Sequence, residues 1–128
     1  MEAAQSRNDQ SQNDQSQKIE NILPPEILSL PKVEIPVSGV DGYCLQNDEK
    51  QVVFFVFDEG VNFPDHSHCD QRGLVISGEM IMVIGGKSSL YQAGDYYQVP
   101  NNVSHRVSFS QKTVLIDMSD APNRYPTV

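Results

Sequence analysis

The histidines of this chain lie in two short glycine-led segments, and their spacing suits a metal site. The segment 60–78 carries His66 and His68, the segment 94–105 ends at His105, and together they hold all three histidines of the chain. Side chains two residues apart on an extended chain project to the same side, so His66 and His68 can converge on one point. Neutral imidazole is the commonest metal-binding side chain in proteins. The spacing therefore predicts a metal site.

His105 is expected to point toward the interior of the protein. In the run 103–109 the apolar residues share one face with His105, and the polar residues occupy the other: Val103, Val107 and Phe109 against Ser104, Arg106 and Ser108. A single histidine on an apolar face is more often a buried core residue than a ligand. Its combination with the pair at 66 and 68 favours a metal ligand.

The two segments resemble the paired motifs of the cupin superfamily. In that family a Gly-x5-His-x-His-x(3,4)-Glu-x6-Gly segment and a Gly-x5-Pro-x-Gly-x2-His-x3-Asn segment supply three histidines and a carboxylate to one metal ion. The residues that match are Gly60, His66, His68, Gly78, Gly94, Pro100 and His105. The resemblance implies an all-β double-stranded β-helix, or jelly-roll barrel, with one divalent transition metal (Zn, Ni, Fe or Mn). The ligands it implies are His66, His68, Gln71 and His105.

The chain departs from the family pattern at the fourth ligand and at one turn. Gln71 stands at the position of the family's glutamate, and it follows His68 more closely than the general pattern prescribes. Small cupins with His-x-His followed closely by Gln are a recognised variant, so a metal site with one negative charge fewer is expected. Asp70 is the alternative fourth ligand, favoured by its charge and disfavoured by its register. Asn102 replaces a motif glycine, and Asn enters left-handed conformations more readily than most residues.

Both cysteines are expected to be free thiols. Cys44 and Cys69 are too few to form a disulfide framework, and nothing else in the sequence indicates an oxidising compartment. A thiolate is a strong ligand for zinc or iron. Strand alternation nevertheless points Cys69 away from the neighbouring histidines.

The sequence indicates one folded domain preceded by a polar tail. The chain has 128 residues, of which 38% are hydrophobic, which suits a single core. Residues 1–20 contain a near-perfect five-residue repeat of Gln, Ser, Asn and Asp, and we predict a disordered low-complexity tail there. Residues 21–128 are predicted to form one cupin-like barrel. Its first part, at about 21–40, is proline-rich and is predicted to be an extended arm.

Short apolar and β-branched runs dominate the rest of the chain, and turn residues separate them. Many short strands without a convincing helical pattern indicate an all-β sandwich or barrel. The predicted strands are 52–57, 73–77, 80–84, 88–92, 96–99, 103–109 and 113–118.

Charge and hydropathy exclude several classes of partner. The formal net charge of -8 argues against binding to nucleic acid, which requires clustered Lys and Arg. No apolar run is long enough to span a membrane, and the first residues do not resemble a secretion signal. We therefore predict a cytoplasmic protein that binds a small molecule. Barrels of this size commonly pair through an edge strand, so we also predict a homodimer.

The resemblance implies a metal-dependent lyase or isomerase acting on a small oxygenated metabolite such as a sugar acid. The alternatives are a non-catalytic ligand-binding or sensing module, an iron-dependent dioxygenase, and a structural barrel with vestigial histidines. No catalytic role is assigned from the sequence. The candidates for an acid or base beside the metal are Tyr91, Tyr96, Tyr97, Arg72, Arg106 and Asp117. Asp117 is distinguished by apolar neighbours on both sides, which could bring its carboxylate to an inner face.

Overall fold

The computed structural model describes residues 22–66 and 71–128. Within these ranges the chain forms strands joined by short turns, with one short helix near the beginning. The elements are α3 (Pro25–Leu28), β1 (Val40–Gln46), β2 (Gln51–Phe57), β3 (Asn62–His66), β4 (Gln71–Ser77), β5 (Glu79–Ile84), β6 (Lys87–Gln92), β7 (Tyr96–Val99), β8 (His105–Ser108) and β9 (Thr113–Ser119). The all-β prediction is confirmed.

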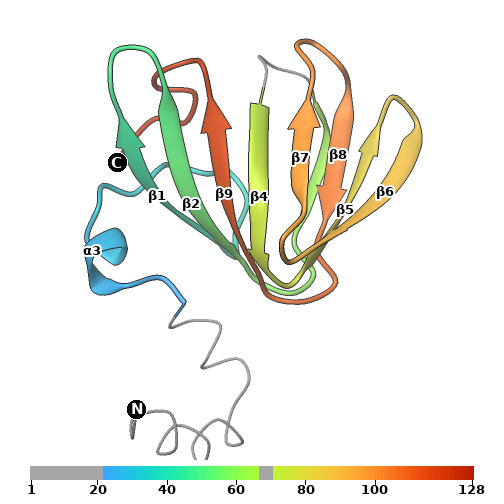
Figure 1. Ribbon diagram of the computed structural model, residues 1–128, viewed down its shortest axis with the longest axis horizontal. Coiled ribbons are helices and arrows are strands. Elements are labelled where there is room, and N and C mark those ends of the chain that lie inside the picture. Colours follow the sequence, from blue (N-terminus) through green and yellow to red (C-terminus); the bar gives the residue numbers. More distant parts are fainter. Residues whose placement is uncertain (1–21, 67–70) are drawn as a thin grey trace, which may run out of the picture.

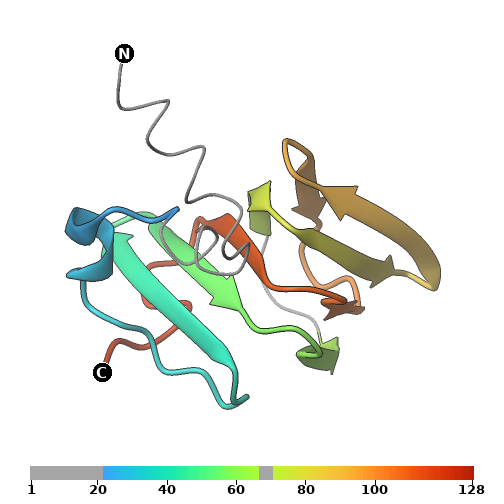
Figure 2. The same ribbon diagram turned by 90° about the horizontal axis from the view of Figure 1, so that it is seen from below.

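The strands form two antiparallel sheets. The five-stranded sheet has the order β1-β2-β9-β4-β7, and the four-stranded sheet has the order β3-β8-β5-β6. Figure 1 follows the strands from β1 at one side of the view to β6 at the other, and Figure 2 gives the perpendicular view. Strands distant in sequence are therefore neighbours, since β9 lies between β2 and β4.

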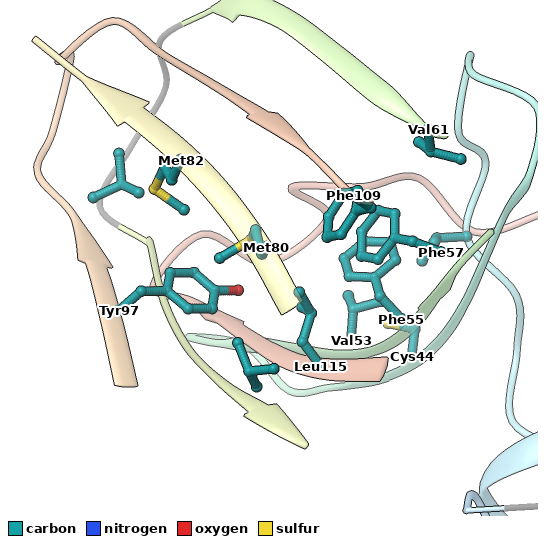
Figure 3. Packing of buried hydrophobic residues seen from close by; sticks show 13 residues of the cluster. Cys44, Val53, Phe55, Phe57, Val61, Met80, Met82, Tyr97, Phe109 and Leu115 are labelled. Carbon is teal, nitrogen blue, oxygen red and sulfur yellow. The ribbon is translucent and has the colours of Figure 1, made fainter. Parts of the chain in front are cut away.

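The core fills the space between the inner faces of the two sheets. Along β2 every second residue is buried, beginning with Gln51 and ending with Phe57, as expected for a strand with one face toward a core. The rings of Phe57 and Phe109 are stacked with centroids 4.0 Å apart, and Figure 3 shows them beside Phe55. Burial of these apolar side chains is the main stabilising contribution to the fold.

The seven predicted strands all exist, with bounds that differ by at most two residues. Two strands, β1 and β3, were not predicted because glycine, proline and polar residues interrupt their apolar pattern. The short helix α3 was also not predicted. It begins at Pro25, whose fixed backbone angle suits the first helical position.

The segment predicted as an extended arm contains α3 and then runs to β1 without a regular strand. After α3 the chain makes isolated bridges from Lys32 to Tyr43 and from Val33 to Thr127. Leu23 and Val33 are buried. The arm therefore lies along β1 and the final residues of the chain. No helix in the described part of the chain has the length and apolar character needed to cross a membrane.

Candidate metal centre

His105 is the first residue of β8, and its side chain is buried. Its neighbour Arg106 is exposed, so the strand alternates as predicted. The Nδ1 atom of His105 lies 3.0 Å from the carbonyl oxygen of Val103. Because a carbonyl can only accept a hydrogen bond, Nδ1 must carry the proton, and the lone pair of the neutral ring is then on Nε2. Metal-binding histidines are commonly held in this way.

The turn before β8 has the conformation that the sequence suggested. Asn102 has a φ of 63°, in the left-handed region that the family's glycine would adopt without strain. The backbone N–H of Val103 donates to the carbonyl of Pro100 at 3.4 Å and closes the turn. This turn directs His105 into the space between the sheets.

His66 is the last residue of β3 and lies opposite His105 in the β3–β8 register. An irregularity in this pairing occurs between Phe63 and His66. The side chain of His66 and all of His68, Cys69 and Asp70 lie outside the described residues, so their roles as ligands or as alternatives stay predictions. Among the residues whose side chains the structure describes, no three His, Cys, Asp or Glu residues are grouped to hold a metal.

Gln71 begins β4 and is 7% exposed. Its Nε2 donates to a carboxylate oxygen of Asp117 and to Oη of Tyr125, the latter at 3.3 Å. The amide nitrogen thus faces Asp117, and Oε1 occupies the other position. Oε1 is buried and has no hydrogen-bond partner among the described residues. A buried amide oxygen without a partner is costly, and a metal ion would satisfy it. Gln71 therefore fits a metal ligand.

A hydrogen-bonded network on the five-stranded sheet holds Gln71. Tyr97 Oη donates to Asp117 Oδ1 at 2.7 Å, and Asp117 also accepts from Gln71. Gly73 lies between Tyr97 and Asp117 in the register of three adjacent strands. A Cβ atom on Gly73 would be 2.3 Å from Tyr97 Oη, so only glycine leaves room for the phenol to reach across β4 to β9.

Burial dominates the electrostatics of this network. Asp117 is 2% exposed, and burial raises the pKa of its carboxyl to about 7, although hydrogen bonds from Tyr97 and Gln71 and the charge of Arg124 oppose the rise. Burial also raises the pKa of the Tyr97 phenol well above its usual value, and the neighbouring Asp117 adds to the rise. The phenol is therefore a hydrogen-bond donor at neutral pH.

Gln71 and His105 line the same cavity between the sheets. It offers about 60 Å³ to the centres of water-sized molecules, enough for several of them. Its polar lining is Gln71, Tyr97, His105, Asp117 and Tyr125. Its apolar lining is Phe55, Phe57, Phe63, Met80, Met82, Val99, Val107, Phe109 and Leu115. Figure 3 shows the Tyr97 phenol directed inward among Met80 and Leu115.

The remaining acid or base candidates from the sequence do not line this cavity. Tyr96 is 54% exposed, Arg72 is paired with the exposed Asp120, and Arg106 points outward. Tyr91 packs its ring against Tyr97, at a centroid distance of 6.1 Å. Of the six candidates, the structure brings Tyr97 and Asp117 to the cavity.

Tyr125 is a cavity residue that the sequence analysis missed. It follows β9, and its ring contacts Phe55 edge-on with centroids 5.3 Å apart. Gln51 fixes its backbone from both sides, donating from Nε2 to the Tyr125 carbonyl at 2.9 Å and accepting from its N–H at 3.0 Å. The one available signal was a tyrosine just before a proline, after the last predicted strand.

Cys44 is a buried free thiol, as predicted for this cysteine. Burial raises the pKa of its thiol. Cys44 is not among the residues that line the cavity, and so the structure gives it no part in the candidate site.

Comparisons with known structures identify the same architecture. One is an RmlC-like cupin from Shewanella frigidimarina NCIMB 400, with 29% identity over 73% of this chain and 86% of that one, and a TM-score of 0.65. KdgF from Halomonas sp. has 20% identity over 71% of this chain and 89% of its own, with a TM-score of 0.63.

A larger protein, salicylate 1,2-dioxygenase from Pseudoaminobacter salicylatoxidans in an adduct with gentisate, has 18% identity over 69% of this chain and 26% of its own, with a TM-score of 0.62. At the identities of this enzyme and of KdgF the likeness shows the fold alone. A comparison with curated protein sequences gave no significant match.

A family model described as a cupin domain matches residues 53–117, which is about half of the chain and includes the predicted ligands. The predicted jelly-roll fold is thus confirmed. On this match, with the two-sheet architecture and the motif residues described above, the chain belongs to the cupin superfamily.

Proposed function

We propose that this cupin binds one divalent transition metal through His66, His68, Gln71 and His105. The observation that carries the proposal is the Oε1 atom of Gln71, which is buried, unpartnered and held away from Asp117 by the orientation of its own amide. His105 supports it, because its hydrogen bond to Val103 leaves the lone pair on Nε2. Both residues line one cavity.

We infer further that the site catalyses a lyase or isomerase reaction on a small oxygenated metabolite. A bound divalent metal would supply Lewis-acid polarisation of a substrate oxygen. The chain itself supplies a cavity between the two sheets that is lined mostly by apolar side chains. Asp117 and Tyr97 act as positioning residues, because their hydrogen bonds fix which atom of the Gln71 amide faces the metal.

The first test is elemental analysis of the protein purified without chelators or a histidine tag. We expect about one equivalent of a transition metal in the parent chain and a clear loss in Gln71→Ala. Gln98→Ala is the matched control, because Gln98 is exposed on β7 and lies on the outer side of the sheet. This control should keep its metal.

The same preparations separate the candidate functions. Turnover of hydroxy acids or keto acids that depends on the metal supports the lyase or isomerase. Binding without turnover supports the sensing module, and oxygen consumption by the iron-loaded protein supports the dioxygenase. A parent chain without metal, even after reloading with Zn²⁺, Ni²⁺, Fe²⁺ and Mn²⁺ in turn, would overturn the metal site.

We also propose a homodimer, a cytoplasmic location and a small-molecule partner rather than nucleic acid. The chain is further proposed to divide into a tail at 1–20 and one domain at 21–128. Light scattering coupled to gel filtration measures the oligomeric state. Limited proteolysis tests the division into tail and domain, and we expect cleavage confined to residues 1–20.

A further inference from the structure

The lining of the cavity divides into a polar part and a larger apolar part. The polar side chains come mainly from the five-stranded sheet. The four-stranded sheet contributes Phe63, Met80, Met82 and Val107 to the lining, together with His105. A ligand whose oxygen atoms meet Gln71 and His105 therefore has its remaining atoms against apolar side chains.

The polar groups of the lining are already bonded within the protein. Tyr97 donates to Asp117, and Gln71 donates to both Asp117 and Tyr125. His105 is bonded to the backbone at Val103. The oxygen of Gln71 is the lining atom without a partner among the described side chains, and the proposed metal takes it. Few groups in the part of the lining that the structure describes are then left to bind hydroxyls on a substrate.

The described lining also holds no lysine or arginine. A substrate carboxylate would therefore have to bind at the metal. A second anionic or strongly hydrated group elsewhere on the substrate would be buried without a partner, which is unfavourable.

We propose that the substrate of this site carries one pair of oxygen atoms for the metal and an apolar remainder, aromatic or branched aliphatic, that packs against Phe63, Met82 and Val107. This inference rests on the proposed metal site and names the class of molecule that the site takes. It disfavours polyhydroxylated sugar acids as the main substrates, because several of their hydroxyls would lose water without gaining a partner in the described lining.

The test compares two ligands that offer the metal the same pair of oxygen atoms. Mandelate and glycerate are both α-hydroxy carboxylates, and they differ in a phenyl against a hydroxymethyl group. Calorimetric titration of the full chain loaded with Zn²⁺ is expected to show mandelate binding roughly ten- to a hundredfold more tightly, the range for burial of one aromatic side group. Equal or tighter binding of glycerate would overturn the proposal, as would failure of both to bind.

A pair of valine variants tests where the apolar group lies. Val107→Thr places a hydroxyl in the lining with little change in volume, and we expect mandelate to lose roughly fivefold in affinity while glycerate is unchanged. Val83→Thr is the matched control, because Val83 lies on the adjacent strand and faces outward. If both variants behave alike, the aromatic group is not in this cavity and the proposal fails.

A titration without metal separates this proposal from the metal site on which it rests. Benzyl alcohol and propane-1,2-diol are added to the metal-free chain, and binding is followed by ligand-observed nuclear magnetic resonance. Preference for benzyl alcohol in a chain that cannot be loaded with metal would retain the apolar cavity and remove the metal assignment. Loss of that preference in a chain that binds metal normally would retain the metal assignment and remove the apolar cavity.

Discussion

The two walls of the cavity hold their candidate ligands by different means. On the four-stranded sheet, His105 is fixed by a backbone carbonyl two residues earlier in the chain. On the five-stranded sheet, Gln71 is fixed by Asp117, which Tyr97 holds in turn, so three strands are required. The first arrangement is local in sequence, whereas the second exists only in the complete sheet. A substitution beside His105 should therefore have a local effect. A substitution in the network of Gln71 should also affect the neighbouring strands.

The largest effect is expected from His105→Ala. Loss of this imidazole removes one of the proposed ligands outright, and metal affinity should fall by more than the roughly hundredfold that a supporting residue can cost. Equilibrium dialysis followed by elemental analysis measures it. Arg106→Ala is the control on the opposite face. Retention of metal by a folded His105→Ala protein would contradict the assignment.

Gly73→Ala tests whether the network on the five-stranded sheet requires that position 73 has no side chain. The new Cβ would be 2.3 Å from Tyr97 Oη and 2.4 Å from the carbonyl oxygen of Ile116. Because a backbone atom cannot move aside easily, we expect the free energy of unfolding to drop by about 3 kcal/mol. Urea denaturation measures the change. Leu74→Ala, at an exposed position, should cost less than about 1 kcal/mol, and a similar small loss in Gly73→Ala would show that the wall adapts.

Asp117→Asn tests the hydrogen-bonded network of the five-stranded sheet with little change in packing. Asparagine keeps one acceptor for Gln71 but loses the charge, so the amide is held less firmly and metal affinity should fall roughly tenfold. Asp120→Asn is the matched control, since Asp120 is an exposed partner of Lys50 and Arg72 and does not line the cavity. Equal affinities in the two variants would mean that Asp117 does not position Gln71.

The smallest effect is expected from Tyr125→Phe. The ring remains against Phe55, and the acceptor at 3.3 Å from Gln71 Nε2 is lost. Metal affinity should fall by less than about fivefold, as expected for one long hydrogen bond. Tyr43→Phe, at the outer face of β1, should leave it unchanged. A loss as large as that of Asp117→Asn would give Tyr125 a greater share in the network than its distance implies.

The burial of His105 on the four-stranded sheet could be predicted from sequence. The hydrogen-bonded network around Gln71 on the five-stranded sheet could not. Alternation along 103–109 was enough to bury His105, and the left-handed turn at Asn102 followed from its residue type. The apolar neighbours of Asp117 indicated a buried carboxylate correctly. Its pairing with Gln71 and Tyr97 depends on the register of β4 with β7 and β9, which no local pattern determines.

The same limit explains the missed elements. β1 contains Gly42 and polar residues, and it becomes a strand by pairing along its whole length with β2. Tyr125 enters the cavity because Gln51, distant in sequence, fixes its backbone. Tertiary pairing overrides weak local preference at both places.

The position of β9 also sets the order in which the molecule can be completed. It is the last strand in the chain, yet it separates the β1–β2 hairpin from β4 and β7 in the five-stranded sheet. Until residue 119 has been synthesised, β2 and β4 each present an open edge, and such edges are templates for pairing with other chains. Assembly of the sheet therefore waits for its most distant segment, a topology that slows folding. A nascent chain of this protein therefore keeps these two edges open until just before the candidate metal site can form.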